Sequence, residues 1–229
     1  MALDSETFDL MKDAVSRFVR EKLVPAEDKV EETNDVPEEI IQEMRELGLF
    51  GLSIPEEYGG LGLSMEQECE VIHELCKASL AFRSVIGTTV GIGSQGLVMT
   101  GTEEQKRQYL PRLASGEIMS SFCLTEPEAG SDAASLRTVA VRDGDDYVLN
   151  GTKRYITNAL RAGMLTVMAR TDSSKKGASG ISAFLVDPAT SGITIAKADE
   201  KMGQRGTKTS DVIFEDARIP AAALLGGAE

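Results

Sequence analysis

The chain has 229 residues, of which 41% are hydrophobic and 27% charged, and its formal net charge is −13. This composition is typical of a globular protein with one large domain or two ordinary ones, and it excludes an intrinsically disordered chain. Residues 1–117 hold 11 Lys and Arg against 23 Asp and Glu, which argues against a nucleic-acid partner because its phosphates would be repelled.

The cellular environment is predicted from the cysteines and the N-terminus. Three cysteines without framework spacing, and a start without a basic region, predict a cytoplasmic protein with no secretory signal. The most apolar window, residues 80–99, contains Arg83 and several glycines, so we expect no membrane span. Residues 118–229 hold 13 Lys and Arg against 14 Asp and Glu, and any phosphate-bearing ligand is expected there.

The start of the chain shows the apolar spacing of helices. Apolar residues recur every three or four positions at Phe8, Met11, Val15, Phe18 and Val19. We expect this first helix to end at Pro25, because proline lacks the N–H that a helix interior needs. A second helix should begin near Pro37 and end at Gly48, since proline is favoured in a first turn and glycine after a last one.

Three more helices are predicted before residue 117. The first has an apolar stripe formed by Met65, Cys69, Ile72 and Cys76. Residues 80–99 are apolar although rich in glycine, and they predict a buried helix. Thr102 and Gln105 form a capping box, so a last helix should begin there and end near Gly116.

After Gly116 the apolar spacing changes to the alternation of β-strands. Residues 136–159 alternate β-branched and polar side chains and contain two turn dipeptides, Asp143-Gly144 and Asn150-Gly151. Strand-like runs follow at 164–170, 181–187, 192–198 and 210–216, with no long helix between them. We therefore predict an α+β protein, with an all-α helical domain at 1–117 followed by an antiparallel β-barrel or sandwich domain at 118–229.

One candidate metal site is weak. Cys69, His73 and Cys76 lie near one helical face, and thiolate and imidazole groups at that spacing can bind zinc. The chain has no second histidine, and the two cysteines belong to the predicted apolar stripe. We therefore expect them to pack in the core and expect no metal site.

A second candidate is the stretch SSFCLTEPEAGSD at residues 120–132. Thr125 ends a strand-like run and offers a hydroxyl and a backbone N–H, while Pro127 stiffens the turn that follows. Gly130 would let successive N–H groups converge, and Ser131 adds a donor. Such a turn could bind a phosphate or the polar edge of a heterocycle, although a plain proline turn between strands explains the same residues.

Two further stretches make the interpretation more specific. Residues 150–159 read NGTKRYITNA and residues 201–220 read KMGQRGTKTSDVIFEDARIP. With LTEPEAGSD at 124–132, their order and spacing resemble the acyl-CoA dehydrogenase family of flavoenzymes. The stretches LGLFGLSIPEEYGGLGLS and GTEEQKRQYLPRLASGE resemble the same family, so the resemblance covers essentially the whole chain.

The resemblance implies FAD as the cofactor. Thr125 and Ser131 would donate hydrogen bonds to the pyrimidine edge and diphosphate of FAD, and Ser131 would also contact the acyl-CoA substrate. Tyr155 would lie against the isoalloxazine, where tryptophan is commoner in the family, and Thr157 would bond near flavin N5. The segment Gln204 to Gly206 is expected to shape the fold. The full set of expected cofactor-binding residues is Phe122, Cys123, Leu124, Thr125, Gly130, Ser131, Tyr155, Ile156 and Thr157.

The implied reaction is the α,β-dehydrogenation of an acyl-CoA thioester to trans-2-enoyl-CoA, as in fatty-acid β-oxidation. In the family a third, C-terminal helical domain carries the glutamate that removes the α-proton, and this chain stops where that domain would begin. We therefore expect that domain to be missing and no catalytic base among these residues, Glu126 and Glu128 included. The 229-residue chain alone is expected to be inactive and to bind FAD weakly or not at all.

The resemblance also implies partners. Electrons would pass to an electron-transferring flavoprotein that docks on the helical domain, and the full-length protein would form a homo-oligomer, either a dimer or a tetramer. The length and branching of the acyl chain stay open. An acyl-CoA oxidase is the alternative within the same enzyme class. A non-catalytic docking or scaffold module of the same fold, with the acidic helical half as its working surface, is the alternative from another class.

Overall fold

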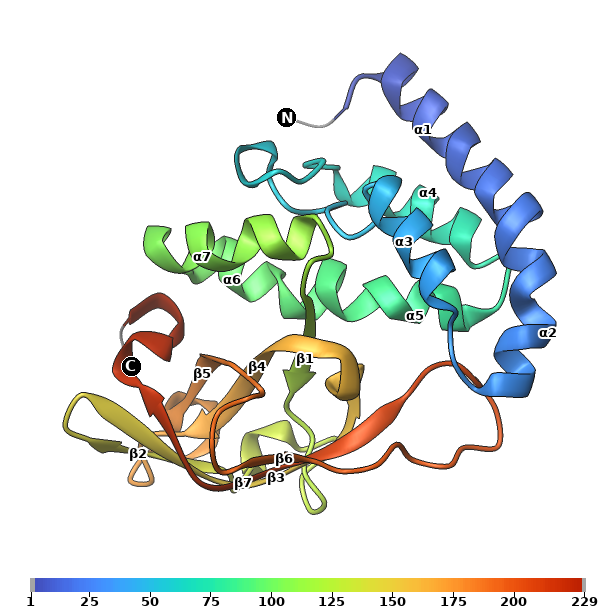
Figure 1. The fold of residues 1–229 in the computed structure, drawn as a ribbon. Coiled ribbons are helices and arrows are strands. Elements are labelled where there is room, and N and C mark those ends of the chain that lie inside the picture. Colours follow the sequence, from blue (N-terminus) through green and yellow to red (C-terminus); the bar gives the residue numbers. More distant parts are fainter. Residues whose placement is uncertain (1–2, 228–229) are drawn as a thin grey trace.

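In the computed structural model, which describes residues 3–227, a group of helices covers one face of a curled β-sheet (Figure 1). The helices are α1 (Ser5–Phe18), α2 (Val24–Thr33), α3 (Glu38–Glu46), α4 (Met65–Leu75), α5 (Leu80–Thr88), α6 (Gln95–Thr100) and α7 (Glu103–Ala114). Within residues 3–227 no helix has the length and apolar character needed to cross a membrane. The predicted α+β class is confirmed, while the domain division after residue 117 stays a prediction.

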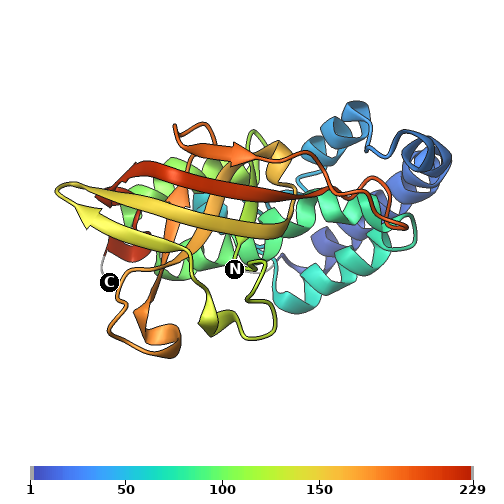
Figure 2. The same cartoon turned by 90° about the horizontal axis from the view of Figure 1, so that it is seen from below.

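The sheet is mixed, whereas a fully antiparallel one was expected. Its strands are β1 (Met119–Cys123), β2 (Val139–Asp143), β3 (Asp146–Thr157), β4 (Ala162–Arg170), β5 (Ile181–Val186), β6 (Ile193–Ile195) and β7 (Thr209–Pro220). Their order is β1-β4-β2-β3-β7-β6, with β5 beside β4 (Figure 2). β1 pairs with β4 in parallel because the β2–β3 hairpin lies between them in the chain, which gives the long crossover that parallel pairing needs.

One of the two predicted turns in this region does not form. Gly144 takes a left-handed φ of 64° in the hairpin between β2 and β3, as predicted. Asn150 and Gly151 instead lie inside β3, where the pairing with β7 shifts register between Leu149 and Gly151. A side chain at Gly151 would meet the Thr138 hydroxyl at 2.4 Å, so the glycine permits close backbone packing and makes no turn.

Pro25 does not end the first helix. A π-helical turn at Val19–Leu23 joins α1 to α2, and Pro25 lies in the first turn of α2. A first-turn residue needs no acceptor for its N–H, so proline costs little there. The other helix ends follow the prediction, since Pro37 caps α3, Gly48 has a φ of 70° after it, and the Thr102–Gln105 capping box opens α7.

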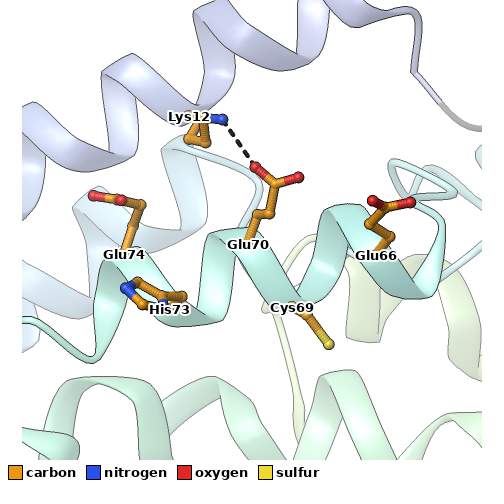
Figure 3. A pocket seen from close by; sticks show the side chains of 6 residues that line it. All are labelled: Lys12, Glu66, Cys69, Glu70, His73 and Glu74. Carbon is orange, nitrogen blue, oxygen red and sulfur yellow. Dashed lines mark hydrogen bonds and ion pairs between the residues drawn. The ribbon is translucent and has the colours of Figure 1, made fainter.

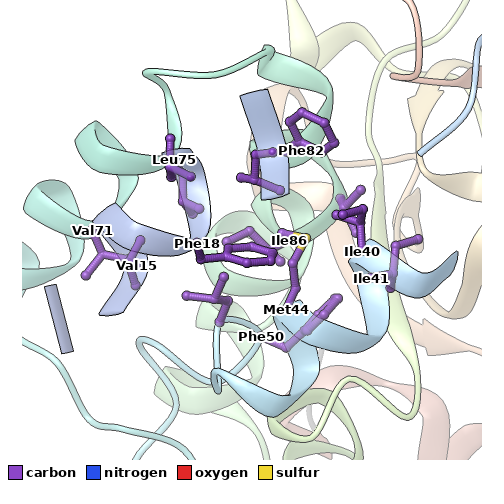
Figure 4. Packing of buried hydrophobic residues seen from close by; sticks show 14 of the residues in the cluster. Val15, Phe18, Ile40, Ile41, Met44, Phe50, Val71, Leu75, Phe82 and Ile86 are labelled. Atoms are coloured by element: carbon purple, nitrogen blue, oxygen red, sulfur yellow. The ribbon is translucent and has the colours of Figure 1, made fainter. Parts of the chain in front are cut away.

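The predicted apolar stripe of α4 is wrong. Val71 and Leu75 are buried, whereas Cys69 and Cys76 are exposed and Met65 is 75% exposed. The face that α4 turns toward α1 lies on the Val71–Leu75 side, as the packing in Figure 4 shows. Cysteine and methionine occur both in a core and on a surface, so their spacing alone does not show which face of the helix is buried.

Residues 80–99 do not form one continuous helix. α5 ends at Thr88, a π-helical turn covers Thr89–Gly93, and α6 begins at Gln95. The break lies at Gly91, whose φ of −93° and ψ of −112° are non-helical. Glycine is the residue that makes such a conformation available at low steric cost.

The helices are fixed to the sheet by side-chain hydrogen bonds. The Asn158 amide donates to the Ser84 carbonyl at 2.7 Å and to the Thr88 hydroxyl at 3.0 Å, which ties the end of β3 to α5. Gln105 of α7 donates to the carbonyl of Leu224 at 2.8 Å. The Gly206 N–H donates to the Asn34 side chain at 2.8 Å, so the loop before β7 shapes the fold, as expected. These bonds connect the helices to the end of β3, to the segment after β7 and to the loop before β7.

Candidate functional site

Tyr155 has an unusual backbone conformation. Its φ is 58°, in the left-handed region that a bulky residue rarely occupies. It lies where β3 leaves its pairing with β7, in a bulge between Lys153 and Ile156. The bulge turns the side chain outward, so the ring is 58% exposed and the Arg154 guanidinium lies 5.0 Å from its centre. Bulges and strained residues of this kind cluster at functional sites.

The segment after β1 makes a tight turn beside this bulge. Glu126 and Ala129 exchange backbone hydrogen bonds of 3.0 and 3.2 Å around Pro127 and Glu128. Gly130 does not take a left-handed φ, and the expectation that successive N–H groups converge at it stays a prediction. A Cβ on Gly130 would meet nothing within 4 Å. The fold therefore does not require glycine there, and its backbone is free for close approach by a ligand.

Two hydrogen bonds join the segment to β3. The Arg154 N–H donates to the Thr125 carbonyl at 2.7 Å, and the Ser121 hydroxyl donates to the Thr157 carbonyl at 2.8 Å. These bonds bring Thr125, Tyr155 and Thr157 to one region of the surface. Thr125 and Thr157 are half-buried and Ser131 is exposed. Within residues 3–227 no hydrogen bond engages the hydroxyls of Thr125, Ser131 or Thr157, so these hydroxyls are available as donors.

The remaining predicted residues differ in accessibility. Phe122 and Leu124 are half-buried, while Cys123 and Ile156 are buried in the core of the sheet. Burial raises the pKa of the Cys123 thiol to about 12, which makes it chemically inert at neutral pH. Any part that Cys123 and Ile156 play in binding would fall to their backbone groups.

A buried ion pair beneath the turn was not predicted from the sequence. The Lys153 ammonium lies 2.8 Å from a Glu126 carboxylate oxygen, and these side chains are 0% and 6% exposed. Burial alone raises the pKa of Glu126, but hydrogen bonds from Lys153 and from the amides of Arg137 and Thr138 lower it on balance. Burial lowers the pKa of Lys153. The sequence indicated this pair only in that Glu126 lies in the stretch LTEPEAGSD and Lys153 lies in the stretch NGTKRYITNA.

These features match the needs of FAD. A flat heterocycle needs an exposed aromatic side chain beside hydroxyl and amide donors, and a diphosphate needs backbone N–H groups without Cβ obstruction. Tyr155, the three free hydroxyls and the open space at Gly130 provide such groups. The residues present therefore fit the cofactor that the motifs imply.

A separate concave surface lies between α1 and α4 (Figure 3). It is lined by Lys12, Glu66, Cys69, Glu70, His73 and Glu74. Lys12 and Glu70 form a 2.8 Å ion pair across it. Within residues 3–227 no group of three or more acidic, cysteine and histidine side chains is placed to bind a metal ion.

The chain matches two family models in sequence. Residues 5–117 match the model of the acyl-CoA dehydrogenase N-terminal domain, and residues 121–217 match that of the acyl-CoA dehydrogenase middle domain. Together these matches include every residue of the site described above.

Curated relatives and a solved structure agree with these matches. An acyl-CoA dehydrogenase of Bacillus subtilis is 39% identical over 95% of this chain and 57% of its own length. An acryloyl-CoA reductase (NADH) of Anaerotignum propionicum is 40% identical over 95% of this chain and 55% of its own. A structure of an acyl-CoA dehydrogenase of Bacillus anthracis complexed with FAD is 35% identical, with a TM-score of 0.87, over 97% of this chain and 38% of that one. The chain thus spans little more than half the length of the two curated relatives.

Proposed function

The chain belongs to the acyl-CoA dehydrogenase family, and on this basis we propose that it provides the flavin-facing surface of an FAD-dependent enzyme that oxidises acyl-CoA thioesters. The observation that carries the proposal is the exposed ring of Tyr155, which is held in a left-handed conformation in the same region of the surface as Thr125 and Thr157. The FAD complex of the Bacillus anthracis relative supports the choice of cofactor.

Each residue has a proposed role in holding the cofactor. Tyr155 would offer its ring to the isoalloxazine, and Thr157 would donate a hydrogen bond to the polar edge of the flavin. Thr125 would donate to the pyrimidine side, and Ser131 to a phosphate, where it would also meet the acyl-CoA. When bound, FAD would supply the acceptor for the hydride that leaves the β-carbon.

No acid near the site is proposed as the catalytic base. Glu126 accepts hydrogen bonds from Lys153 and from two backbone amides, and its lowered pKa makes it a weak base. Glu128 is exposed and pairs with Arg137. We propose that a glutamate outside these 229 residues removes the α-proton, as the family resemblance implies.

The electron acceptor and assembly are also proposals. An electron-transferring flavoprotein would accept the electrons at the helical half of the molecule, and copies of the full-length protein would assemble into a homo-oligomer. A second candidate reaction is the reverse one, the reduction of an enoyl-CoA, since one relative at 40% identity is named an acryloyl-CoA reductase.

A spectrum of the flavin tests the proposal. The protein, with any sequence that naturally follows residue 229, is purified, and its visible spectrum is recorded without oxygen as acyl-CoAs of graded length are added. We expect a yellow protein whose flavin absorbance is bleached by at least one acyl-CoA and returns slowly in air. Rapid return in air would indicate an oxidase, and bleaching by NADH that an enoyl-CoA reverses would indicate a reductase. A colourless protein that takes up no FAD would refute the proposal.

A further inference from the structure

Glu126 and Lys153 form a buried ion pair, and Lys153 stands two residues before Tyr155 in β3. Both charges have lost almost all their contact with water, because the side chains are 6% and 0% exposed. A buried pair adds little stability compared with apolar side chains of the same size, since desolvation offsets the attraction. Fold stability is therefore a weak reason for burying two charges at this place.

The pair holds both ends of the segment from Leu124 to Thr138. The Glu126 carboxylate accepts the Arg137 N–H at 2.6 Å on one oxygen and the Thr138 N–H at 2.9 Å on the other. The Lys153 ammonium donates to the Leu124 carbonyl at 3.1 Å, in addition to its bond with Glu126. One pair of side chains thus closes the loop that contains the turn at Pro127.

The same pair fixes this loop to the strained part of β3. Lys153 is the last residue of β3 that pairs with β7 before the bulge. The next residue, Arg154, donates its N–H to the Thr125 carbonyl at 2.7 Å, and Tyr155 follows. A change in the ion pair would therefore alter the separation between the loop hydroxyls and the Tyr155 ring.

We propose that Glu126 and Lys153 are positioning residues, which hold Thr125 and the Ser131 turn in register with Tyr155 and Thr157. The proposal rests on the proposed FAD site. On this proposal Glu126 and Lys153 contribute to FAD binding because they fix the position of the loop, and this contribution is separate from their effect on folding.

Three variants of the 229-residue chain test this proposal against a control. Glu126→Gln and Lys153→Met each leave one buried partner unpaired, and the double variant Glu126→Gln/Lys153→Met removes both charges. Val186→Ala is the control, because it trims a buried side chain of the same sheet core on β5, a strand that pairs with β4 and contains no residue of the loop or the bulge. Denaturant midpoints, amide hydrogen exchange and FAD titration to millimolar concentration are measured for all of them.

Local exchange should separate positioning from stability. We expect the Arg137 and Thr138 amides to exchange about tenfold or more faster in Glu126→Gln than in Val186→Ala, after correction for global stability, because a charge-assisted acceptor is lost. The double variant should recover its denaturant midpoint relative to the single variants but keep the fast loop exchange, since its amide side chain has one acceptor oxygen where the carboxylate has two. FAD affinity should follow the loop exchange and not the midpoint.

The outcomes separate this proposal from the proposed function. Loop exchange in Glu126→Gln that matches Val186→Ala would overturn the positioning role, whatever the FAD result. FAD affinity that is unchanged in Glu126→Gln while the loop exchanges faster would overturn the link to the site. If the wild-type chain shows no FAD binding at millimolar concentration, the cofactor assignment fails for this chain, and the exchange data alone decide whether the pair positions the loop.

Discussion

The backbone N–H of Arg154 donates a 2.7 Å hydrogen bond to the carbonyl of Thr125. At Arg154 the strand β3 has left its pairing with β7, so the bond replaces a sheet bond with one to the neighbouring loop. The bond holds the free hydroxyl of Thr125 beside the bulge that exposes Tyr155. The bulge of β3 and the loop that follows β1 are thus joined directly by a backbone hydrogen bond.

Replacing Tyr155 by glycine should stabilise the fold and weaken the site. Glycine has no steric penalty at a φ of 58°, so the relief should add about 1 kcal/mol to the free energy of unfolding. FAD affinity should fall about tenfold with the loss of the aromatic contact. Denaturant unfolding and FAD titration measure the two effects. Gln204→Gly is the control, because Gln204 has a φ of 52° on an exposed loop. This control variant should gain stability without losing FAD affinity. A loss of FAD affinity in Gln204→Gly equal to that in the Tyr155 variant would contradict the prediction.

Two glycine substitutions should separate an effect on FAD binding from an effect on fold stability. Gly130→Ala should change the free energy of unfolding by less than about 1 kcal/mol, because its φ is unstrained and the added Cβ meets nothing. It should nevertheless lower FAD affinity, because the Cβ obstructs the approach to the loop backbone. Gly206→Ala should destabilise by several times more, since its φ is 84° and a Cβ would lie 2.5 Å from Val30. Thermal and denaturant unfolding compare the two. A Gly130→Ala variant with unimpaired FAD binding would exclude the proposed backbone contact.

Acid should weaken the fold through Glu126. The folded pKa of this carboxyl lies below its ordinary value of 4.5, because the bonds from Lys153 and two amides outweigh the effect of burial. Its contribution to stability is therefore complete above pH 4.5 and is lost as the pH falls through the lower folded pKa. Glu126→Gln should cost about 3–5 kcal/mol at neutral pH and should flatten the dependence of unfolding free energy on pH below 4.5. An unchanged acid profile would show that Glu126 is not the titrating group.

The 229-residue chain should bind FAD weakly by itself. Tyr155 is 58% exposed, so a flavin laid on it would keep much of its opposite face in water. Apolar burial contributes about 25 cal/mol per Å², and a few hundred Å² left unburied lowers affinity by several orders of magnitude. We expect a dissociation constant in roughly the micromolar range or weaker and no enoyl-CoA formation by isothermal titration and product assay. Submicromolar binding would contradict this expectation.

Local patterns predicted several elements well. The Thr102–Gln105 capping box, the Pro37 start, the Gly48 end and the strand alternation depend on local backbone chemistry, and each of them is present. The apolar face of α4 was misplaced because cysteine fits a core or a surface, and only packing against α1 decides between them. The Asn150-Gly151 dipeptide lies within β3 because tertiary packing against Thr138 overrides its turn preference.

The site was predicted only in part. The residues that would face the flavin came from the motif resemblance, because no local rule indicates that Tyr155 leaves the regular strand conformation. The ion pair between Glu126 and Lys153 joins two motifs that only the sheet topology brings together. The parallel pairing of β1 with β4 depends on the same long-range arrangement, and alternation within each strand does not reveal it.

Chemical-shift mapping of FAD binding tests the proposed flavin surface. Amide shifts of the 229-residue chain are followed as FAD is added to millimolar concentration, which detects weak binding as well as tight binding. We predict saturable shifts concentrated at Thr125, at Gly130 and Ser131, and at Tyr155 to Thr157, with little change in α1 to α4. Shifts that gather elsewhere, or none at millimolar FAD, would contradict the assignment of this surface to the flavin.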